Sequence, residues 1–279
     1  MKASYNPTLS LTLALTLLGV ISVTASASAS SPWELTGTTE FPREMQPLVF
    51  EGLCAHHGRF VMNTKYSVFV MDTQLNVVTS TPNAIPSELL EEGDNHLGDC
   101  VCDEVTSLCY YAVEEPSKTK PSIFVYNLTS TGVIFKTEKH QPIQSHMPWV
   151  ALDPVTGYLY SSEYDNVNEL RVYSAETLDY LHTVSIDGDA IPLNGVQGGA
   201  FYSGKLYVGI NAGDSVFEID VTTGHTELSI QQFPEGSSSE YEFEGLTFLD
   251  LRSEGKGMMH NTGNHIHPQV MFHADVKGL

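Results

Sequence analysis

Hydrophobic and polar residues alternate in short runs along most of the chain, and turn residues separate these runs. The clearest unit contains the alternating runs Gln197–Tyr202, Lys205–Ile210, Ser215–Val221 and His225–Ile230, joined by turns rich in Gly, Asp and Thr. Alternation combined with β-branched and aromatic residues is typical of β-strands. The pattern therefore predicts four antiparallel strands in this unit.

The preceding unit repeats the scheme. Its runs Trp149–Leu152, Tyr158–Ser162, Glu169–Ser174 and Tyr180–Ile186 predict four further strands. Helical periodicity is largely absent, and one helical turn is expected at Ser87–Glu92.

Five such units follow one another. Phe-Glu-Gly-Leu occurs at residues 50–53 and again at 243–246, and the units between them open near Asp99, Trp149 and Gln197. The spacing of roughly 47–50 residues lies in the range of propeller blades. We therefore predict an all-β fold, a five-bladed β-propeller. A β-sandwich would explain the alternation but not the period.

The last unit is one strand short. Runs near 243–249, 257–262 and 269–275 supply three strands, and the segment Trp33–Thr38 near the other end of the chain offers a fourth. Pairing this segment into the last blade would close the ring and remove an exposed sheet edge.

The first 30 residues resemble a targeting segment. Lys2 precedes an apolar stretch from Leu9 to Val23, and small residues follow at 25–29. This is the pattern of a signal peptide, and an anchoring helix is the alternative. We predict a signal peptide at 1–30, a single propeller domain at 31–279, and a secreted, extracellular protein without a membrane span. Asn127-Leu128-Thr129 is a glycosylation sequon in an expected surface turn, so Asn127 is a predicted glycosylation site.

Acidic residues dominate the charge. The chain has 34 Asp and Glu against 13 Lys and Arg, a formal net charge of −21. This surface repels nucleic acid, so no nucleic-acid partner is expected. The charge suits a soluble secreted protein or one that binds cations. Because the chain has no phosphate-binding glycine motif, nucleotide cofactors are not supported either.

Four cysteines, Cys54, Cys100, Cys102 and Cys109, allow two disulfides and three connectivities. Cys102 and Cys109 flank a short turn, so they can face each other across one hairpin, which leaves Cys54 and Cys100 on neighbouring inner strands. We prefer this pairing. A zinc site is the rival interpretation, although Cys-x-Cys spacing suits tetrahedral zinc poorly.

Propeller geometry selects candidate site residues. The first strand of each blade lines the central channel, and its start shares one face of the ring with the loop after the second strand. The strand openings on this face are Glu51, Asp99, Gln197 and Glu244, with His146 just before the third opening. The ends of second strands add Asn63 and Asn211.

These side chains are rich in oxygen donors of the kind that Ca²⁺ binds. Carboxylates that converge on one axis repel one another unless a cation or a base lies among them. We therefore predict a divalent cation, Ca²⁺ before other metals, bound by Glu51, Asp99, Gln197, Asn211 and Glu244. A wet channel lined with carboxylates is the alternative.

The Glu-Gly pairs at 51–52 and 244–245 resemble blade openings in the gluconolactonase and paraoxonase group of propellers. The resemblance implies that Glu51 or Glu244 holds a catalytic metal, with Asn63 and Asn211 as partners. That group has six blades, whereas five units are counted here.

Histidines add further candidates. His146, at the channel mouth, could act as a general base. His260, His265, His267 and His273 in the last blade are either metal ligands or turn and surface residues. The adjacent His56 and His57 fall at a turn on the opposite face and are assigned no role.

Two functions remain open. In the first, the protein is an enzyme: a metal-assisted hydrolase, lyase or cyclase that acts on a small molecule or glycan. Its catalytic residues are then His146, Glu51 and Glu244. Alternatively, it is a non-catalytic module that binds a sugar, a peptide or extracellular matrix and holds a structural ion. The sequence leaves the substrate and the oligomeric state open.

Overall fold

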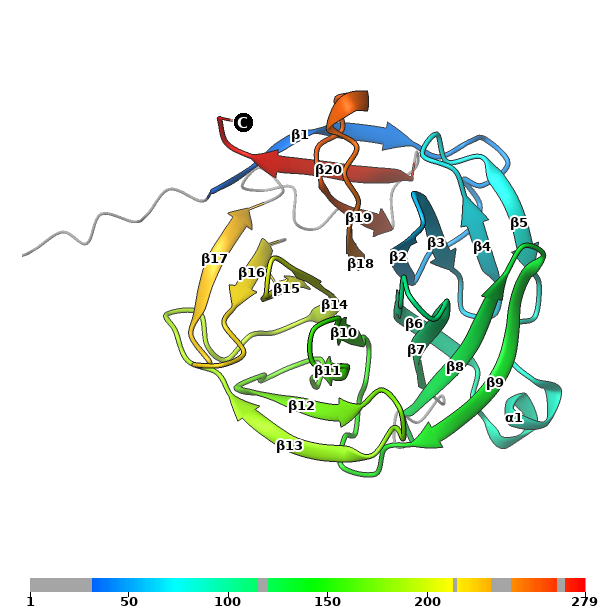
Figure 1. Cartoon of the computed structure of the whole chain (residues 1–279), viewed down its shortest axis with the longest axis horizontal. Helices are drawn as coiled ribbons and strands as arrows, with labels where there is room; N and C mark the ends of the chain where they lie inside the picture. Colours follow the sequence, from blue (N-terminus) through cyan, green and yellow to red (C-terminus); the bar gives the residue numbers. More distant parts are fainter. Residues whose placement is uncertain (1–31, 115–119, 213–214, 232–241, 265–268, 279) are drawn as a thin grey trace, which may run out of the picture. The chain divides into compact units, whose positions relative to one another are not determined.

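The structure is a computed structural model that describes residues 32–114, 120–212, 215–231, 242–264 and 269–278. Its strands form five antiparallel sheets of four strands each, arranged as blades around a central channel (Figure 1). The predicted all-β, five-bladed propeller is confirmed. The predicted signal peptide lies outside the described residues.

The strands run from the channel to the rim in chain order within the first four blades (Figure 1). Blade one contains β2 (Gly52–His56), β3 (Arg59–Asn63), β4 (Val68–Met71) and β5 (Val77–Thr81). Blade two contains β6 (His96–Cys102), β7 (Leu108–Glu114), β8 (Ser122–Thr129) and β9 (Gly132–His140). Blade three contains β10 (Ala151–Asp153), β11 (Tyr158–Ser161), β12 (Glu169–Ser174) and β13 (Tyr180–Ser185). Blade four contains β14 (Val196–Tyr202), β15 (Lys205–Ile210), β16 (Ser215–Ile219) and β17 (Thr226–Gln231).

Blade five combines both ends of the described chain. It contains β18 (Glu242–Phe248), β19 (Met259–Asn264), β20 (Val270–Val276) and, on the outside, β1 (Trp33–Glu40). β1 pairs antiparallel with β20, from Trp33 opposite Val276 to Glu40 opposite Val270. The indole of Trp33 is buried between blades four and five, against Tyr202, Tyr207 and Phe248. The predicted closure of the ring is thus confirmed.

The hydrophobic core is divided among the five blade interfaces. One buried cluster lies between each pair of neighbouring blades, and each joins residues of both, as Phe50 and Met271 do between blades one and five. Trp149 is fully buried in the cluster between blades three and four. Removing this apolar surface from water is what holds the blades together.

Regular elements outside the blades are short. Helix α1 (Ser87–Glu92) matches the predicted helical turn and leads into β6, and a 3-10 helix (Arg252–Glu254) lies between β18 and β19. None of the described helices has the length and hydrophobicity that a membrane span requires.

Candidate active site at the channel mouth

A pocket of about 290 Å³ opens at the end of the channel where the innermost strands begin. All five blades contribute to its wall, because the start of each innermost strand faces the same end of the ring. The lining residues are Val49, Glu51, Lys65, His96, Gly98, His146, Pro148, Tyr164, Gln197, Glu242 and Glu244. The pocket therefore combines carboxyl, imidazole, amide, phenol and ammonium groups.

Glu244 is a buried acid of this pocket with a raised pKa. Its side chain is 4% exposed at the start of β18, and Gln197 donates a hydrogen bond from Nε2 to its Oε1 at 3.1 Å. Burial raises the pKa of Glu244 well above the ordinary glutamate value, and the neighbouring Glu51 and Glu242 raise it further. These surroundings favour the neutral acid.

Glu51 has different partners. It is also buried, but Nε2 of His96 lies 3.1 Å from its Oε2 and Nζ of Lys65 lies 3.9 Å from its Oε1. Glu51 thus has an imidazole and an ammonium group as neighbours, whereas Glu244 is hydrogen-bonded to an amide. Two neighbouring carboxyl groups are therefore held in unlike surroundings.

A β-bulge aims Glu244 at the pocket. The pairing of β18 with β19 shifts register between Glu244 and Leu246, and Gly245 at the bulge has φ 70°. A Cβ atom at Gly245 would stand 2.5 Å from the backbone nitrogen of Leu53 in blade one. Only glycine allows this conformation and this close approach together.

His146 and Tyr164 form the blade-three wall. Their rings stack with centroids 5.2 Å apart, and Asn211 donates from Nδ2 to the Tyr164 hydroxyl at 3.3 Å. The backbone N–H of His146 donates to Oε2 of Glu163 at 2.9 Å, which fixes the loop before β10. His146 therefore stands where a general base was predicted.

Two predicted metal ligands point elsewhere. Asp99 is fully buried at the axis, where Leu53 N donates to its Oδ1 at 2.9 Å and Gly199 N donates to its Oδ2 at 3.1 Å. Asn211 accepts a hydrogen bond from Phe243 N at Oδ1, at 2.6 Å. Neither residue lines the pocket.

The predicted calcium ion fits this donor set poorly. The structure brings Glu51, Gln197 and Glu244 to one pocket, but both Asp99 oxygens are engaged by backbone N–H groups. The Lys65 ammonium also places a positive charge beside Glu51. Calcium needs six to eight oxygen ligands, and this pocket offers few that are uncommitted.

Three pocket residues with ionisable nitrogen or carboxyl groups were not predicted from the sequence. His96 begins β6, Lys65 follows β3 by two residues, and Glu242 stands two residues before Glu244 on the same face of β18. The period-2 alternation of a strand was the available signal for Glu242, because side chains two apart share a face.

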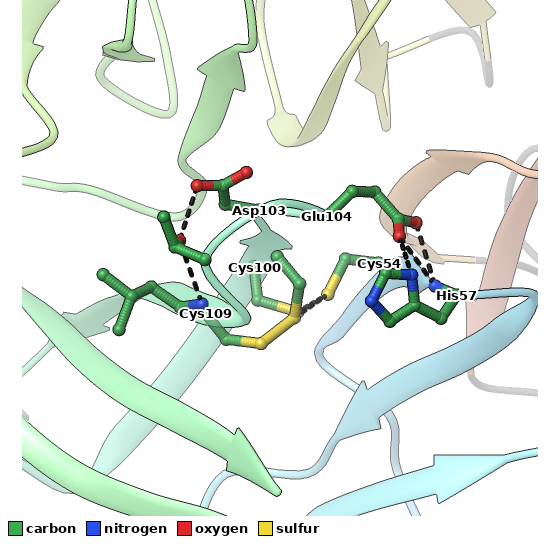
Figure 2. Close-up of a disulfide and its surroundings, with 9 residues drawn as sticks. Cys54, His57, Cys100, Asp103, Glu104 and Cys109 are labelled. Carbon is green, nitrogen blue, oxygen red and sulfur yellow. Dashed lines mark hydrogen bonds and ion pairs between the residues drawn. A yellow bond between two sulfur atoms is a disulfide. The ribbon is translucent and has the colours of Figure 1, made fainter.

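The cysteines gather between blades one and two (Figure 2). Cys102 and Cys109 form a disulfide, as predicted. Cys54 and Cys100 are buried thiols whose sulfurs lie 3.2 Å apart, so the second predicted pairing is close in space but is not a bond here. Asn127 is exposed but lies within β8, because the turn begins three residues later, at Ser130.

Two of the last-blade histidines, His260 and His273, differ from both predictions made for them. His260 and His273 are buried, and their Nδ1 atoms lie 2.8 Å apart. His260 donates from Nε2 to Leu249 O, which leaves its Nδ1 to accept the proton of His273 Nδ1. The pair is thus a hydrogen-bonded part of the core. His265 and His267 lie outside the described residues.

A second polar cluster lies at the other end of β2, about 15 Å along a five-residue strand from the pocket. One ligand atom each from His56, His57 and Glu104 lies within 4.8 Å of the others, an arrangement that could hold a metal ion. It is the sole group of three His, Cys, Asp or Glu found this close within the described part of the chain.

Comparison with known proteins shows the fold. No protein-family model matches the chain, and no curated protein matches its sequence. Among solved structures, Myxococcus xanthus glutaminyl cyclase is similar with a TM-score of 0.62 and 13% identity, covering 88% of this chain and 97% of that chain. At this identity the likeness establishes the propeller fold alone.

Two weaker likenesses accompany it. The PQQ-bound aldose sugar dehydrogenase of Streptomyces coelicolor has a TM-score of 0.49 and 9% identity over 88% of this chain and 98% of that chain. A chain of a nidogen/laminin complex has a TM-score of 0.48 and 14% identity over 72% of this chain and 69% of that chain. Both of these TM-scores lie below 0.5.

Proposed function

We propose that the channel-mouth pocket is an active site that moves protons on a small substrate, in a hydrolytic, lyase or cyclisation reaction. The observation that carries this is the pair Glu244 and Glu51. Burial and like charge favour the neutral form of Glu244, while His96 and Lys65 lie against Glu51. Pairs of acids in unlike surroundings are how many enzymes obtain a general acid and a general base at one pH.

The roles follow from these surroundings. Glu51 takes the proton of the attacking hydroxyl, water or amine, and Glu244 gives its proton to the leaving group. His146, at the same mouth, orients the substrate or shares the role of base. The lining of Tyr164, Gln197 and Lys65 suits a polar molecule, and about 290 Å³ admits a small metabolite or a short peptide end.

A recessed pocket favours catalysis over the alternative, a non-catalytic binding module. A sugar-binding or matrix-binding plate would present several exposed aromatic rings, whereas Tyr164 is the aromatic residue among those that line this pocket. Glutaminyl cyclase shares the fold, so cyclisation of a glutaminyl peptide end belongs among the reactions to be tested first.

The test is a panel of small substrates with matched variants. The protein is incubated with glutaminyl peptides, lactones and aryl glycosides, and product release is followed for wild type, Glu244→Gln, Glu51→Gln and Glu227→Gln. Glu227 is an exposed residue on the outer strand of blade four and serves as the control. Loss of a proton-transfer group lowers turnover by about 10²–10⁴-fold.

Each outcome is informative. Turnover that disappears in the two pocket variants and persists in Glu227→Gln supports the proposal. Turnover that survives in Glu244→Gln contradicts the assigned acid. Binding of a panel member without turnover, lost in Glu244→Gln, would establish the binding module instead.

We also propose that the protein is secreted after removal of residues 1–30, which leaves one propeller domain at 31–279. The Cys102–Cys109 disulfide supports this, because disulfides persist in oxidising compartments. Expression in a eukaryotic secretory host should place the protein in the medium with an N-terminus near Ser31. A glycosidase-sensitive mass that disappears in Asn127→Gln would identify the glycan.

A further inference from the structure

We propose that His56, His57 and Glu104 form a zinc-binding site at the end of the ring opposite the channel-mouth pocket. His56 is the last residue of β2, His57 lies in the turn between β2 and β3, and Glu104 comes from the turn between β6 and β7. A bound ion would therefore join blade one to blade two. This inference does not depend on the proposed function of the pocket.

The backbone of the β2–β3 turn brings the two histidines together. Side chains of adjacent strand residues point to opposite faces, but His57 has φ 47° and Gly58 has φ 72°. This left-handed turn folds the His57 ring back, so that its centroid lies 4.1 Å from that of His56. One nitrogen of each imidazole consequently lies close to the Glu104 carboxylate.

His56 supplies a second observation that points to a ligand. Its side chain is 8% exposed, and its buried Nε2 has no hydrogen-bond partner within the described part of the protein. An imidazole nitrogen without a hydrogen-bond partner is the kind of donor that a metal ion can take up.

Glu104 closes the site from blade two (Figure 2). Its Oε2 lies 2.7 Å from Nδ1 of His57, and both of its carboxylate oxygens accept the backbone N–H of His57 at 2.9 Å. Asp103 fixes this turn by accepting hydrogen bonds from Val105 N and Thr106 Oγ1. The carboxylate is thus already directed at the histidine pair before an ion arrives.

The dimensions suit zinc after a small adjustment. Zinc lies about 2.0–2.2 Å from imidazole nitrogen and carboxylate oxygen, so ligands of one ion stand about 3–4 Å apart. The three ligand atoms lie within 4.8 Å of one another, and the side chains of His57 and Glu104 are 65% and 54% exposed and can move. Two imidazoles and one carboxylate select zinc over calcium, which prefers oxygen alone.

Zinc would take the place of the direct contact between His57 Nδ1 and Glu104 Oε2, which lie 2.7 Å apart. Since the ligands are contributed by two blades, the bound ion should also stabilise the folded chain. At zinc concentrations 100-fold above the dissociation constant, the melting temperature should rise by about 5–10 °C.

The experiment measures thermal unfolding and zinc content of the disulfide-intact protein after exposure to a chelator. Wild type is compared with His56→Gln, Glu104→Gln and His57→Asn, with ZnCl₂ or CaCl₂ added. Asparagine tolerates the left-handed backbone of residue 57 but removes the imidazole. His182→Gln, an exposed histidine on the outer strand of blade three, is the matched control.

The proposal predicts one zinc per chain and a higher melting temperature in wild type and His182→Gln. It predicts at least a tenfold weaker zinc affinity in the three site variants, and no effect of calcium. An equal rise in His56→Gln would place zinc elsewhere and overturn the proposal. So would the absence of retained zinc in wild type by equilibrium dialysis and metal analysis.

Discussion

Replacing Asp99 with Asn tests whether one buried carboxyl group holds the blades together at the axis. Leu53 N from blade one donates to Oδ1, and Gly199 N from blade four donates to Oδ2. An asparagine side chain keeps one acceptor oxygen, but its NH₂ group cannot accept the second N–H. A buried donor without a partner costs about 1–3 kcal/mol, so Asp99→Asn should lose about that much free energy of unfolding.

The pH dependence provides an independent check. Burial raises the pKa of Asp99 to about 8, although backbone N–H groups of Leu53, Cys100, Gly199 and Leu246 oppose this shift. Above pH 4 the folded state therefore binds more protons than the unfolded state. The free energy of unfolding that protonated Asp99 contributes is lost as pH rises towards 8. Between pH 6.5 and pH 8, one group with this pKa lowers the free energy of unfolding by about 1.5 kcal/mol.

The assay is equilibrium urea unfolding at pH 6.5 and pH 8, followed by fluorescence of the buried Trp33 and Trp149. Glu244 is present in both proteins, so the difference in free energy of unfolding between wild type and Asp99→Asn reports on Asp99. We expect this difference to be about 1.5 kcal/mol smaller at pH 8 than at pH 6.5. A variant as stable as wild type at pH 6.5 would refute the role of Asp99 as an acceptor. A difference that does not change with pH would refute its neutral form.

Three further changes test the framework. Gly245→Ala should cost about 1–3 kcal/mol from its left-handed backbone alone, as measured by urea unfolding. Replacing both Cys102 and Cys109 with Ser opens a loop of sequence separation 7 and should cost about 2–3 kcal/mol; an unchanged melting temperature would argue against the disulfide. Burial lowers the pKa of His260 to about 4 and that of His273 to about 3, so the stability they contribute above pH 6.5 is lost as pH falls. Between pH 6.5 and pH 4.5, the free energy of unfolding of His273→Gln should fall by about 2 kcal/mol less than that of wild type. An equal fall in both proteins would contradict this.

The repeat made the fold predictable, since each blade carries its own alternation and turns. Trp33–Thr38 could be placed in the last blade because that unit lacked one strand, and β1 now pairs there with β20. The same geometry selected Glu51, Gln197 and Glu244, which lie within two residues of the first residue of an inner strand and line one pocket. Repetition fixes where a strand starts, and the start decides which end of the ring a side chain faces.

Local irregularities limited the prediction of the site. The pairing of β6 with β7 shifts register between Leu97 and Cys100, so simple counting from the unit opening failed in this blade. His96 reaches the pocket, whereas Asp99 turns to the axis. A bulge is hard to recognise from the pattern of apolar residues. It changes the face of the sheet to which the following side chains point, but it does not change the composition of the strand.

Contacts between blades were harder to predict than contacts within them. His56 and His57 were assigned no role at their turn, and Glu104 carried no signal of its own in the sequence. Their proximity depends on how two hairpins stand side by side in the ring, and on the left-handed φ at His57. No spacing in the sequence encodes that distance, so the cluster emerges only from the three-dimensional arrangement.

The groups at the channel axis differ in chemistry from those at its mouth. A cation there would require oxygen atoms to converge, yet the backbone groups that face Asp99 are N–H donors from blades one, two, four and five. A carboxyl group satisfies donors, so the centre of this ring is closed by an acid instead of an ion. With Asp99 committed to the blades, the acids nearer the surface, Glu51 and Glu244, stay available at the mouth. We therefore propose proton transfer at that end of the ring and metal binding at the histidine turn at the other.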